Sequence, residues 1–281
     1  MSALKETPAA TDTTARIMDW IGNAAKEAAA RLAQADGETK NRALRAAAQA
    51  VRDSSAAILD ANERDMQAAE AKGLMRAMLD RRGLSMPTAH FGLDLLESDF
   101  PRAAEIARTL GVRTIICPHI AADLRPSDEA GWRAFARRLA AVAEKCRAAG
   151  LEFAWHNHDF EFHQTADGVV PMRVILDAAP EIGWEIDVAW VVRGGADPLA
   201  WIDEYGTRII AAHVKDIAPE GDAADEDGWA DVGHGVLDWK AIFAALRQHT
   251  GARVFVMEHD NPNDIERFAQ RSIASARTFE E

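Results

Sequence analysis

Residues 181–217, EIGWEIDVAWVVRGGADPLAWIDEYGTRIIAAHVKDI, constrain the fold most, because they hold two apolar runs separated by one helix pattern. The first run ends in Asp187, and the second has His213 near its end. Between them, Asp197 and Pro198 predict an N-cap and a first helical position. Parallel strands joined by a helix end at the same edge of a sheet. We therefore expect Asp187 and His213 side by side at that edge, where α/β folds place their sites.

A third apolar run, residues 253–260 (RVFVMEHD), holds Glu258 at an equivalent position. Taken singly, Asp187 fits a turn cap, His213 an interior histidine and Glu258 a strand-end ion pair. Acid, histidine and acid at the ends of successive strands instead form an oxygen and nitrogen ligand set that suits Mn²⁺, Mg²⁺, Co²⁺ or Zn²⁺. We expect a divalent-metal site at this edge of the sheet.

A fourth run, residues 152–162 (EFAWHNHDFEF), has a dense polar end. The alternation of a strand places His156 and His158 on the same face. Glu161 lies beyond the predicted strand and has to fold back to reach that face. This run therefore offers further candidate ligands.

Composition excludes several classes of function. The formal net charge is −13 and no basic run interrupts it, so nucleic acid is not an expected partner. No apolar run approaches a membrane span, and residues 1–14 lack the basic end and apolar core of a signal peptide. Cys117 and Cys146 lie far apart, as in a reducing compartment. We therefore expect a cytoplasmic protein with no membrane partner.

The spacing of apolar residues changes along the chain. Residues 14–72 are rich in alanine and have helical spacing, with breaks at Gly37 and at residues 53–55. Six short apolar runs alternating with helices follow, at residues 83–90, 113–120, 152–158, 183–188, 209–215 and 254–259. A long helix is predicted from an N-cap at Ser127 to a stop at Gly150. This alternation predicts a parallel sheet that is buried on both faces.

At these motifs the chain resembles the sugar phosphate isomerases and epimerases with a xylose isomerase-like barrel. The resemblance rests on WHNHDFEF, EIDVAW with GGADPLAWI, RIIAAHVKD, DVGHGVLDW and VFVMEHD, and it covers about residues 74–281. It implies a TIM-type barrel with one divalent metal at its C-terminal face, held by Asp187, His213, Glu258 and a fourth ligand. Many members have Glu-Asn-His where this chain has His-Asn-His, so His156 or Glu161 is the implied fourth ligand.

The preceding segment, about residues 14–80, resembles the helical start of gamma-glutamyl phosphate reductase. This resemblance rests on NAAKEAAARLA, ETKNRALRAAAQAV, ILDANERDMQAAEAKGL and AMLDR, and it ends before that family's nicotinamide-binding region and catalytic cysteine. It implies no reductase activity. We expect a fusion of a helical segment, residues 1–75, with a partial barrel, residues 76–281.

The expected fold class is α/β, an incomplete (β/α) TIM-type barrel of about six parallel strands preceded by an α-helical N-terminal segment. The two opening strands of the family's barrel are not found. An incomplete barrel has two open sheet edges, which invite pairing with a second copy of the chain or covering by the N-terminal helices. A homo-oligomer through these edges is therefore one expectation.

Isomerising or epimerising a keto-sugar requires a proton to be removed beside a carbonyl and returned elsewhere, while the enediolate oxygen is stabilised. Glu258 is the candidate base, because in the family metal-bound carboxylates also take this role. His158 is a candidate for the second proton transfer, for a hydrogen bond to a hydroxyl, or for orienting a ligand. Lys215 shares a strand face with His213 and fits either carbonyl polarisation or a salt bridge to a rim acid.

Weaker candidates lie at other strand ends. The substrate-binding candidates are Trp190, His119, His90 and Trp155, and core packing is the alternative for each. The loop of residues 231–238, DVGHGVLD, precedes a helix capped by Asp238. It is either a plain connection or a source of backbone amides for a phosphate or hydroxyl.

These features favour a metal-dependent isomerase or epimerase of a keto-sugar or sugar phosphate, whose partner is that small molecule. A keto-sugar dehydratase of the inosose type, or another lyase, is the alternative, because proton abstraction beside a carbonyl can also end in elimination. A histidine in place of the usual carboxylate removes one candidate base and favours this alternative. A third interpretation is an inactive fusion that acts only in binding.

Overall fold

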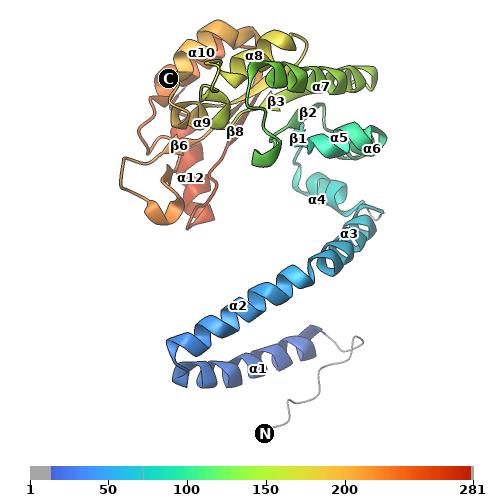
Figure 1. Cartoon of the computed structure of the whole chain (residues 1–281), viewed down its shortest axis with the longest axis vertical. Coiled ribbons are helices and arrows are strands. Elements are labelled where there is room, and N and C mark those ends of the chain that lie inside the picture. Colours follow the sequence, from blue (N-terminus) through green and yellow to red (C-terminus); the bar gives the residue numbers. More distant parts are fainter. Residues whose placement is uncertain (1–13, 72, 280–281) are drawn as a thin grey trace. The chain divides into compact units, whose positions relative to one another are not determined.

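The computed structural model describes residues 14–71 and 73–279 (Figure 1). The chain divides into two compact units, Met1–Leu74 and Met75–Glu281. Among the described helices, none has the length and apolar character needed to cross a bilayer.

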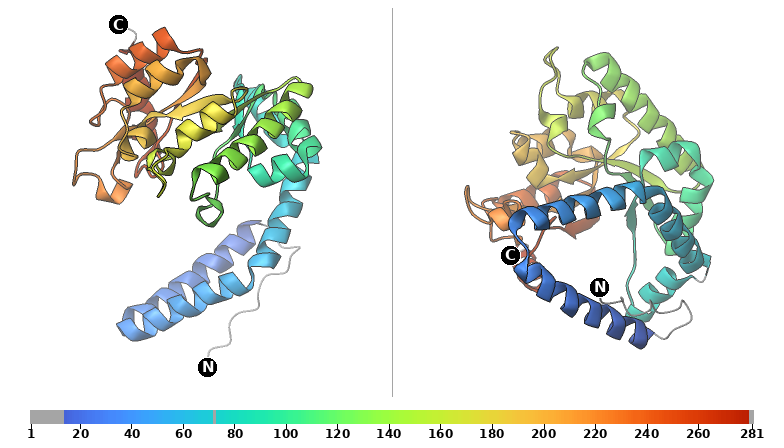
Figure 2. Two further views of the ribbon diagram at one scale, coloured as in Figure 1. Left: turned by 45° about the horizontal axis from the view of Figure 1, so that its top comes forward. Right: turned by 60° about the horizontal axis from the view of Figure 1, so that its bottom comes forward.

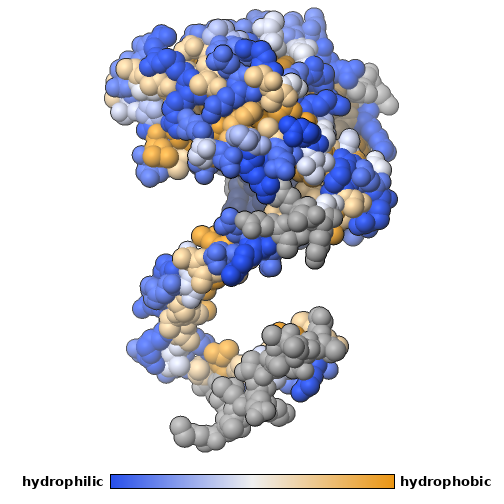
Figure 3. Space-filling model, turned by 90° about the vertical axis from the view of Figure 1, so that its right-hand side faces the viewer, coloured by the Kyte–Doolittle hydropathy of each residue, from blue (hydrophilic) through white to orange (hydrophobic). Residues whose placement is uncertain are grey.

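The first unit is helical, as predicted. Its helices are α1 (Thr14–Gln34), α2 (Gly37–Asp53) and α3 (Ser55–Ala71). Gly37 begins α2, because the Asp36 carboxylate caps this helix by accepting a hydrogen bond of 2.6 Å from the Thr39 amide. Within α2 no described side chain is buried. Leu44 and Val51 are exposed, and Figure 3 shows apolar side chains at the surface of this unit.

The second unit is built on a six-stranded parallel sheet, which confirms the predicted fold class. Its strands, in spatial order, are β1 (Thr88–His90), β2 (Thr114–Cys117), β3 (Glu152–His156), β4 (Gly183–Asp187), β5 (Ile209–Val214) and β8 (Val254–Met257). All four residues of β2 are buried, as expected for a sheet covered on both faces. Within the described residues, the outer edges of β1 and β8 pair with no strand, so pairing with a second copy stays a prediction.

The first strand is shorter than the predicted run of residues 83–90. Helix α4 (Leu74–Arg82) continues up to that run, and Gly83 closes it with a left-handed φ of 63°. Glycine adopts this conformation without a Cβ penalty, and the Leu84 amide then donates back to the Leu79 carbonyl at 2.9 Å. Only Thr88–His90 is left to pair with β2.

Helices connect the strands and lie along the outside of the sheet (Figure 2). They are α5 (Leu93–Ser98), α6 (Phe100–Leu110), α7 (Glu129–Ala148), α8 (Pro171–Ala178), α9 (Val188–Arg193), α10 (Pro198–Tyr205), α11 (Trp239–His249) and α12 (Ile265–Ala276). The predicted cap of α7 at Ser127 is wrong. Asp128 takes this position and accepts a 2.8 Å hydrogen bond from the Gly131 amide. Aspartate and serine cap about equally well, so the sequence pattern does not choose between neighbours.

The sheet curls into a half-barrel, so that side chains from distant strands meet inside it. His90 at the end of β1 lies 2.6 Å from Glu185 on β4, although β2 and β3 lie between these strands. In a flat sheet these two strands would be about 14 Å apart. At the other end of the strands, Arg253 pairs with Glu152 at 2.7 Å, which joins β8 to β3.

A second, smaller ladder follows β5 and was not predicted. Strand β6 (Asp216–Ile217) pairs antiparallel with β7 (Trp229–Ala230). The buried Asp216 carboxylate accepts hydrogen bonds from the amides of Ile217 at 2.9 Å, Gly233 at 2.9 Å, Gly235 at 3.1 Å and Leu237 at 3.2 Å. The amides of Gly233, Gly235 and Leu237 therefore bind a side chain of the chain itself, and the loop is a structural connection.

We predict that Asp216→Asn lowers the free energy of unfolding of the second unit by about 2–4 kcal/mol. The NH₂ group of asparagine is a hydrogen-bond donor, so it cannot accept the bonds that the backbone amides donate to the carboxylate. Asp238→Asn is the matched control. Asp238 accepts one bond, from the Ala241 amide at 3.0 Å, as the cap of α11. Asparagine caps as well as aspartate, so a change below about 0.5 kcal/mol is expected.

Urea unfolding followed by tryptophan fluorescence measures both variants, because every tryptophan except Trp20 lies in the second unit. Equal, small changes in the two variants would show that the Asp216 carboxylate does not hold this loop.

Candidate active site

Three strand ends meet at the C-terminal edge of the sheet, as the sequence predicts. Asp187 and His213 are register partners of β4 and β5. The Glu258 amide donates to the Val214 carbonyl at 3.2 Å and so continues the pairing of β8 beyond Met257. Parallel pairing thus brings three side chains from distant parts of the sequence to one place.

We call Asp187, His213 and Glu258 the rim group. His213 Nδ1 lies 2.8 Å from Glu258 Oε2 and 3.7 Å from Asp187 Oδ2. One ligand atom of each residue lies within 4.8 Å of the other two, close enough to bind a single ion. Asp187 and His213 are buried, whereas the Glu258 side chain is 35% exposed and can meet a substrate.

Asp187 has the capping role that the sequence leaves open for it, and this role uses only one of its two oxygens. Its Oδ1 accepts a 3.0 Å hydrogen bond from the Trp190 amide and caps α9. Its Oδ2 is buried and makes no hydrogen bond. Asn157 fixes this strand end, since its side chain accepts from the Asp187 amide at 2.9 Å and donates to the Asp187 carbonyl at 3.1 Å. Sequence reasoning gave Asn157 no such role.

Lys215 is buried, with 1% of its side chain exposed, and lies among carboxylates. Its Nζ is 2.7 Å from Asp260, 3.2 Å from Glu258 and 3.7 Å from Asp187. It also lies 4.4 Å from the centre of the Trp229 ring. The salt bridge that the sequence offered as an alternative is therefore present. Asp260 was not predicted, although it follows Glu258 closely on the same polar strand end.

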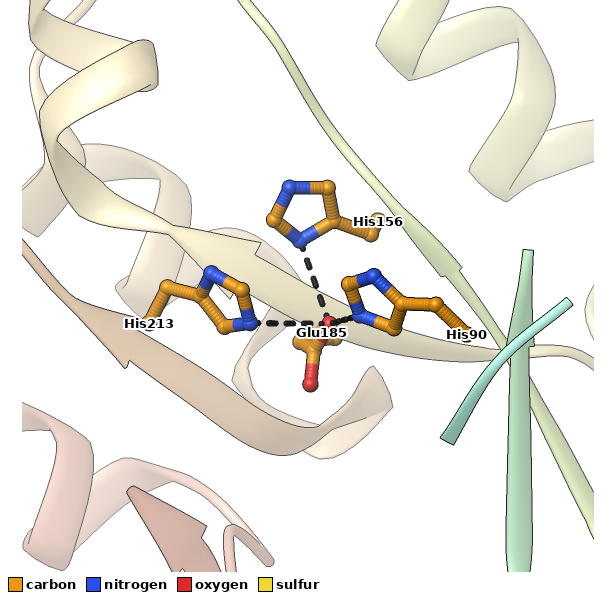
Figure 4. A group of neighbouring side chains, drawn as sticks. All are labelled: His90, His156, Glu185 and His213. Carbon is orange, nitrogen blue, oxygen red and sulfur yellow. Dashed lines mark hydrogen bonds and ion pairs between the residues drawn. The ribbon is translucent and has the colours of Figure 1, made fainter. Parts of the chain in front are cut away.

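A second cluster shares His213 with the rim group, and we call it the inner group: His90, His156, Glu185 and His213 (Figure 4). One oxygen of Glu185 lies 2.6 Å from His90 Nε2, 3.2 Å from His156 Nδ1 and 3.2 Å from His213 Nε2. Sequence reasoning missed Glu185. The available signal was its place two residues before Asp187, which puts both on one face of β4.

The two groups share the His213 ring, which controls their charge. Burial by itself lowers the pKa of His213, but the carboxylates of Asp187, Glu185 and Glu258 outweigh burial and raise this pKa to about 12. Burial raises the pKa of Glu185, but the three imidazoles outweigh it and hold that pKa below its ordinary value. Protonated His213 therefore lies between ionised carboxylates when no metal is bound.

The Glu258 carboxylate is also held in its charged form. Burial raises its pKa, whereas His213 and the Lys215 ammonium lower it to about 2. Glu258 is thus an ionised, accessible carboxylate at neutral pH.

Glu161 lies apart from both groups. Its buried carboxylate accepts hydrogen bonds from Trp155 Nε1 at 3.1 Å and from the His158 amide at 2.9 Å. Burial raises the pKa of Glu161 to about 8, although these two hydrogen bonds act to lower it. Of the two candidates for a fourth ligand, the structure brings His156 and not Glu161 next to His213, with ring centres 4.5 Å apart.

The remaining candidate residues surround the His158 ring, with the exception of Trp155. His158 lies 5.3 Å from His119 and 5.4 Å from Trp190, measured between ring centres. Burial lowers the pKa of His158 to about 3, with help from the neighbouring His156 and His119, so His158 is neutral. Trp155 is fully buried and packs on Phe135 at 5.2 Å, which is core packing.

Neither cysteine belongs to the site. Cys117 and Cys146 are free, buried thiols, and burial raises the pKa of each to about 12. A thiol with so high a pKa is a poor nucleophile.

Part of the chain is similar to gamma-glutamyl phosphate reductases. It is 52% identical over 71 residues to the enzyme of Paramagnetospirillum magneticum, which is 25% of this chain and 16% of that protein. It is 29% identical over 238 residues to the enzyme of Brucella suis, which covers 74% of this chain and 55% of that protein. The second similarity extends beyond the predicted helical segment. The chain thus spans 55% of the length of the Brucella suis enzyme and 16% of the length of the Paramagnetospirillum magneticum enzyme.

Solved structures show the same fold. A sugar phosphate isomerase/epimerase from Parabacteroides distasonis superposes with a TM-score of 0.61 at 21% identity, over 74% of this chain and 76% of that chain. A probable 3-DHS dehydratase, AsbF, from Bacillus anthracis gives 0.57 at 15% identity, over 77% and 84%. The IolI protein with a bound zinc atom gives 0.57 at 16% identity, over 70% and 76%.

The family model of the xylose isomerase-like TIM barrel matches residues 59–279. This match includes every strand of the sheet and both groups of polar side chains. The chain therefore belongs to the xylose isomerase-like TIM barrel family.

Proposed function

We propose that this chain is a divalent-metal-dependent isomerase or epimerase of a keto-sugar or sugar phosphate. The observation that supports it most is the rim group, in which Asp187, His213 and Glu258 converge from adjacent strand ends. Family members and structural neighbours are named as sugar isomerases, epimerases and a dehydratase, which is consistent with this class of reaction.

The residues of the rim group fit a divalent ion. The Asp187 Oδ2 atom is buried and makes no hydrogen bond, and its ion-pair partners His213 and Lys215 lie 3.7 Å away, so a metal ion bound directly to it would stabilise it. Carboxylates and one imidazole are ligands that Mn²⁺, Mg²⁺, Co²⁺ and Zn²⁺ accept. We propose His156 as the fourth ligand, since Glu161 is held by Trp155 and by the His158 amide.

A divalent ion in the rim group would act as a Lewis acid on the substrate carbonyl. Glu258 is ionised and accessible, and we assign it the removal of the proton beside that carbonyl. Lys215 donates to Glu258 at 3.2 Å and holds it in place. His158 is neutral and half-buried, so it can donate a hydrogen bond to a sugar hydroxyl or exchange a proton with it.

The wall of the site suits a sugar ring. His119 and Trp190 both lie next to His158, and the Trp190 ring is also 5.1 Å from Lys215 Nζ. An indole face packs well on the C–H side of a sugar. We assign Trp190 and His119 to substrate binding.

We also propose that the protein is cytoplasmic, as expected from its sequence.

A dehydratase is the second candidate. It is favoured by the resemblance of WHNHDFEF to the family's motif, which implies a carboxylate where this chain has His156 and so leaves Glu258 as the main base of the rim group. A single base removes a proton readily, but it cannot return one to the opposite face of the substrate. The similarity to a probable dehydratase agrees with this alternative.

We predict that Asp187→Asn lowers the affinity for Mn²⁺ by at least about 100-fold, because it removes the charge of a ligand at nearly constant volume. The free energy of unfolding should change by less than about 2 kcal/mol, because the amide oxygen still caps α9. Titration followed by the electron paramagnetic resonance of free Mn²⁺ measures the affinity.

The matched control is Asp197→Asn, because Asp197 caps α10 by accepting from the Leu199 amide at 2.9 Å, outside both groups. Its Mn²⁺ affinity should equal that of the unmodified chain. The same Mn²⁺ affinity in the Asp187 variant would rule out Asp187 as a ligand.

We predict that the Mn²⁺-loaded chain exchanges deuterium from D₂O into the carbon beside the carbonyl of its keto-sugar, and that Glu258→Gln slows this exchange by about 10²–10⁴-fold. Mass spectrometry over a panel of ketopentoses, ketohexoses and their phosphates measures the exchange. Exchange with loss of water would identify the dehydratase, and exchange without it the isomerase or epimerase.

Glu204→Gln is the control, since Glu204 forms an exposed ion pair with Arg173 away from the rim group. Its exchange rate should not change. Equal rates in the Glu258 and Glu204 variants would remove Glu258 from the reaction.

A further inference from the structure

The inner group differs from the rim group in composition and position. It joins His90 from β1, His156 from β3, Glu185 from β4 and His213 from β5 around a single carboxylate oxygen (Figure 4). The three nitrogen atoms lie 2.6, 3.2 and 3.2 Å from that oxygen. Three imidazole nitrogens therefore converge on one carboxylate oxygen inside the half-barrel.

Hydrogen bonding alone does not account for this arrangement. One carboxylate oxygen has two lone pairs, yet three imidazole nitrogens converge on Glu185 Oε2. The other oxygen, Oε1, is buried and makes no hydrogen bond, and His156 Nδ1 lies 3.2 Å from Oε2 without forming a hydrogen bond to it. Buried polar atoms are normally paired, so these two indicate that a binding partner of the cluster is missing.

We infer that His90, His156, Glu185 and His213 form a second metal position, which takes a tetrahedral transition ion of the Zn²⁺ or Co²⁺ type. Imidazole nitrogens suit these ions, and three histidines with one further ligand is a common zinc set. Bond lengths of about 2.0–2.1 Å place neighbouring ligands of a tetrahedral ion about 3.3 Å apart. Two of the three distances to Glu185 Oε2 have this value within 0.2 Å, at 3.2 Å each.

This position is distinct from the rim group, although both use the His213 ring and His156 is also the proposed fourth ligand of the rim ion. Nε2 of His213 faces Glu185, whereas Nδ1 faces Asp187 and Glu258. A neutral imidazole has one unprotonated nitrogen, so it serves one ion at a time. An ion in the inner group should therefore compete with an ion in the rim group.

The two positions should bind different ions, because their charges and their ligand types differ. The rim group has two carboxylates, and the Lys215 ammonium lies 3.2 Å from Glu258 and 3.7 Å from Asp187. Among the described residues, Glu185 forms ion pairs with histidines alone. Oxygen ligands favour Mn²⁺ or Mg²⁺ at the rim, and nitrogen ligands favour Zn²⁺ or Co²⁺ in the inner group.

Solvent reaches the inner group at His90. His156, Glu185 and His213 are buried, whereas 37% of the His90 side chain is exposed. His90 also belongs to an edge strand of the sheet. The inference does not depend on the proposed reaction, because neither His90 nor Glu185 has a role in it.

The test is titration of the metal-free full-length chain with Zn²⁺, followed by calorimetry, and with Co²⁺, followed by its visible absorption. Glu185→Gln and His90→Gln each remove one ligand found only in the inner group. Each should lower Zn²⁺ affinity by at least about 100-fold, a larger loss than the 10–100-fold typical of residues that only support a ligand. Each should also abolish the strong absorption of tetrahedral Co²⁺.

Glu258→Gln and Asp187→Asn are the matched controls, because they remove ligands found only in the rim group. Their Zn²⁺ affinities should stay within about threefold of the affinity of the unmodified chain. This change is smaller than the loss of about 10–100-fold that is typical when a residue supporting a ligand is replaced. Circular dichroism of every variant checks the fold. If Glu185→Gln does not fold, His90→Gln decides the question, since His90 is partly exposed.

Unchanged Zn²⁺ affinity in His90→Gln would overturn the inference, and so would a loss of Zn²⁺ binding confined to the rim variants. Failure of the proposed sugar reaction would leave these outcomes unaffected, because they are read from metal binding alone.

Discussion

The parallel pairing of β4 with β5 is the interaction on which the rest of the site depends. It puts Asp187 and His213 in register, and the pairing of β5 with β8 adds Glu258 from the next strand. The Asn157 side chain accepts a hydrogen bond from the Asp187 amide and donates one to the Asp187 carbonyl, which holds this register from the side of β3. A shift of one residue would turn every side chain of β4 to the other face and separate these ligands.

The buried charges of the site compensate one another. An unpaired buried ion costs several kcal/mol, so Lys215 and protonated His213 have to lie among carboxylates, as they do. The arrangement leaves Asp187 Oδ2 and Glu185 Oε1 without hydrogen bonds. These two atoms mark where the compensation is incomplete, one in each group, and they are the physical basis for assigning a cation to each position.

Much of this could be predicted from the sequence, because strand ends and helix caps are local signals. The apolar runs predicted the six strands, and their polar ends predicted the proximity of Asp187 and His213. The contacts of Glu185 could not be predicted from the sequence. Its partners come from other strands, and the curl of the sheet decides which side chains meet. The position of Glu161 depends on Trp155 and the His158 amide, contacts that no periodic pattern records.

The most direct test of the account is a crystal structure of the full-length chain soaked with Mn²⁺, with the ion located by its anomalous scattering. The account predicts a peak within bonding distance of Asp187, of Nδ1 of His213 and of Glu258. No peak at these three residues in a crystal that diffracts well would contradict the central claim that this strand edge is a metal centre.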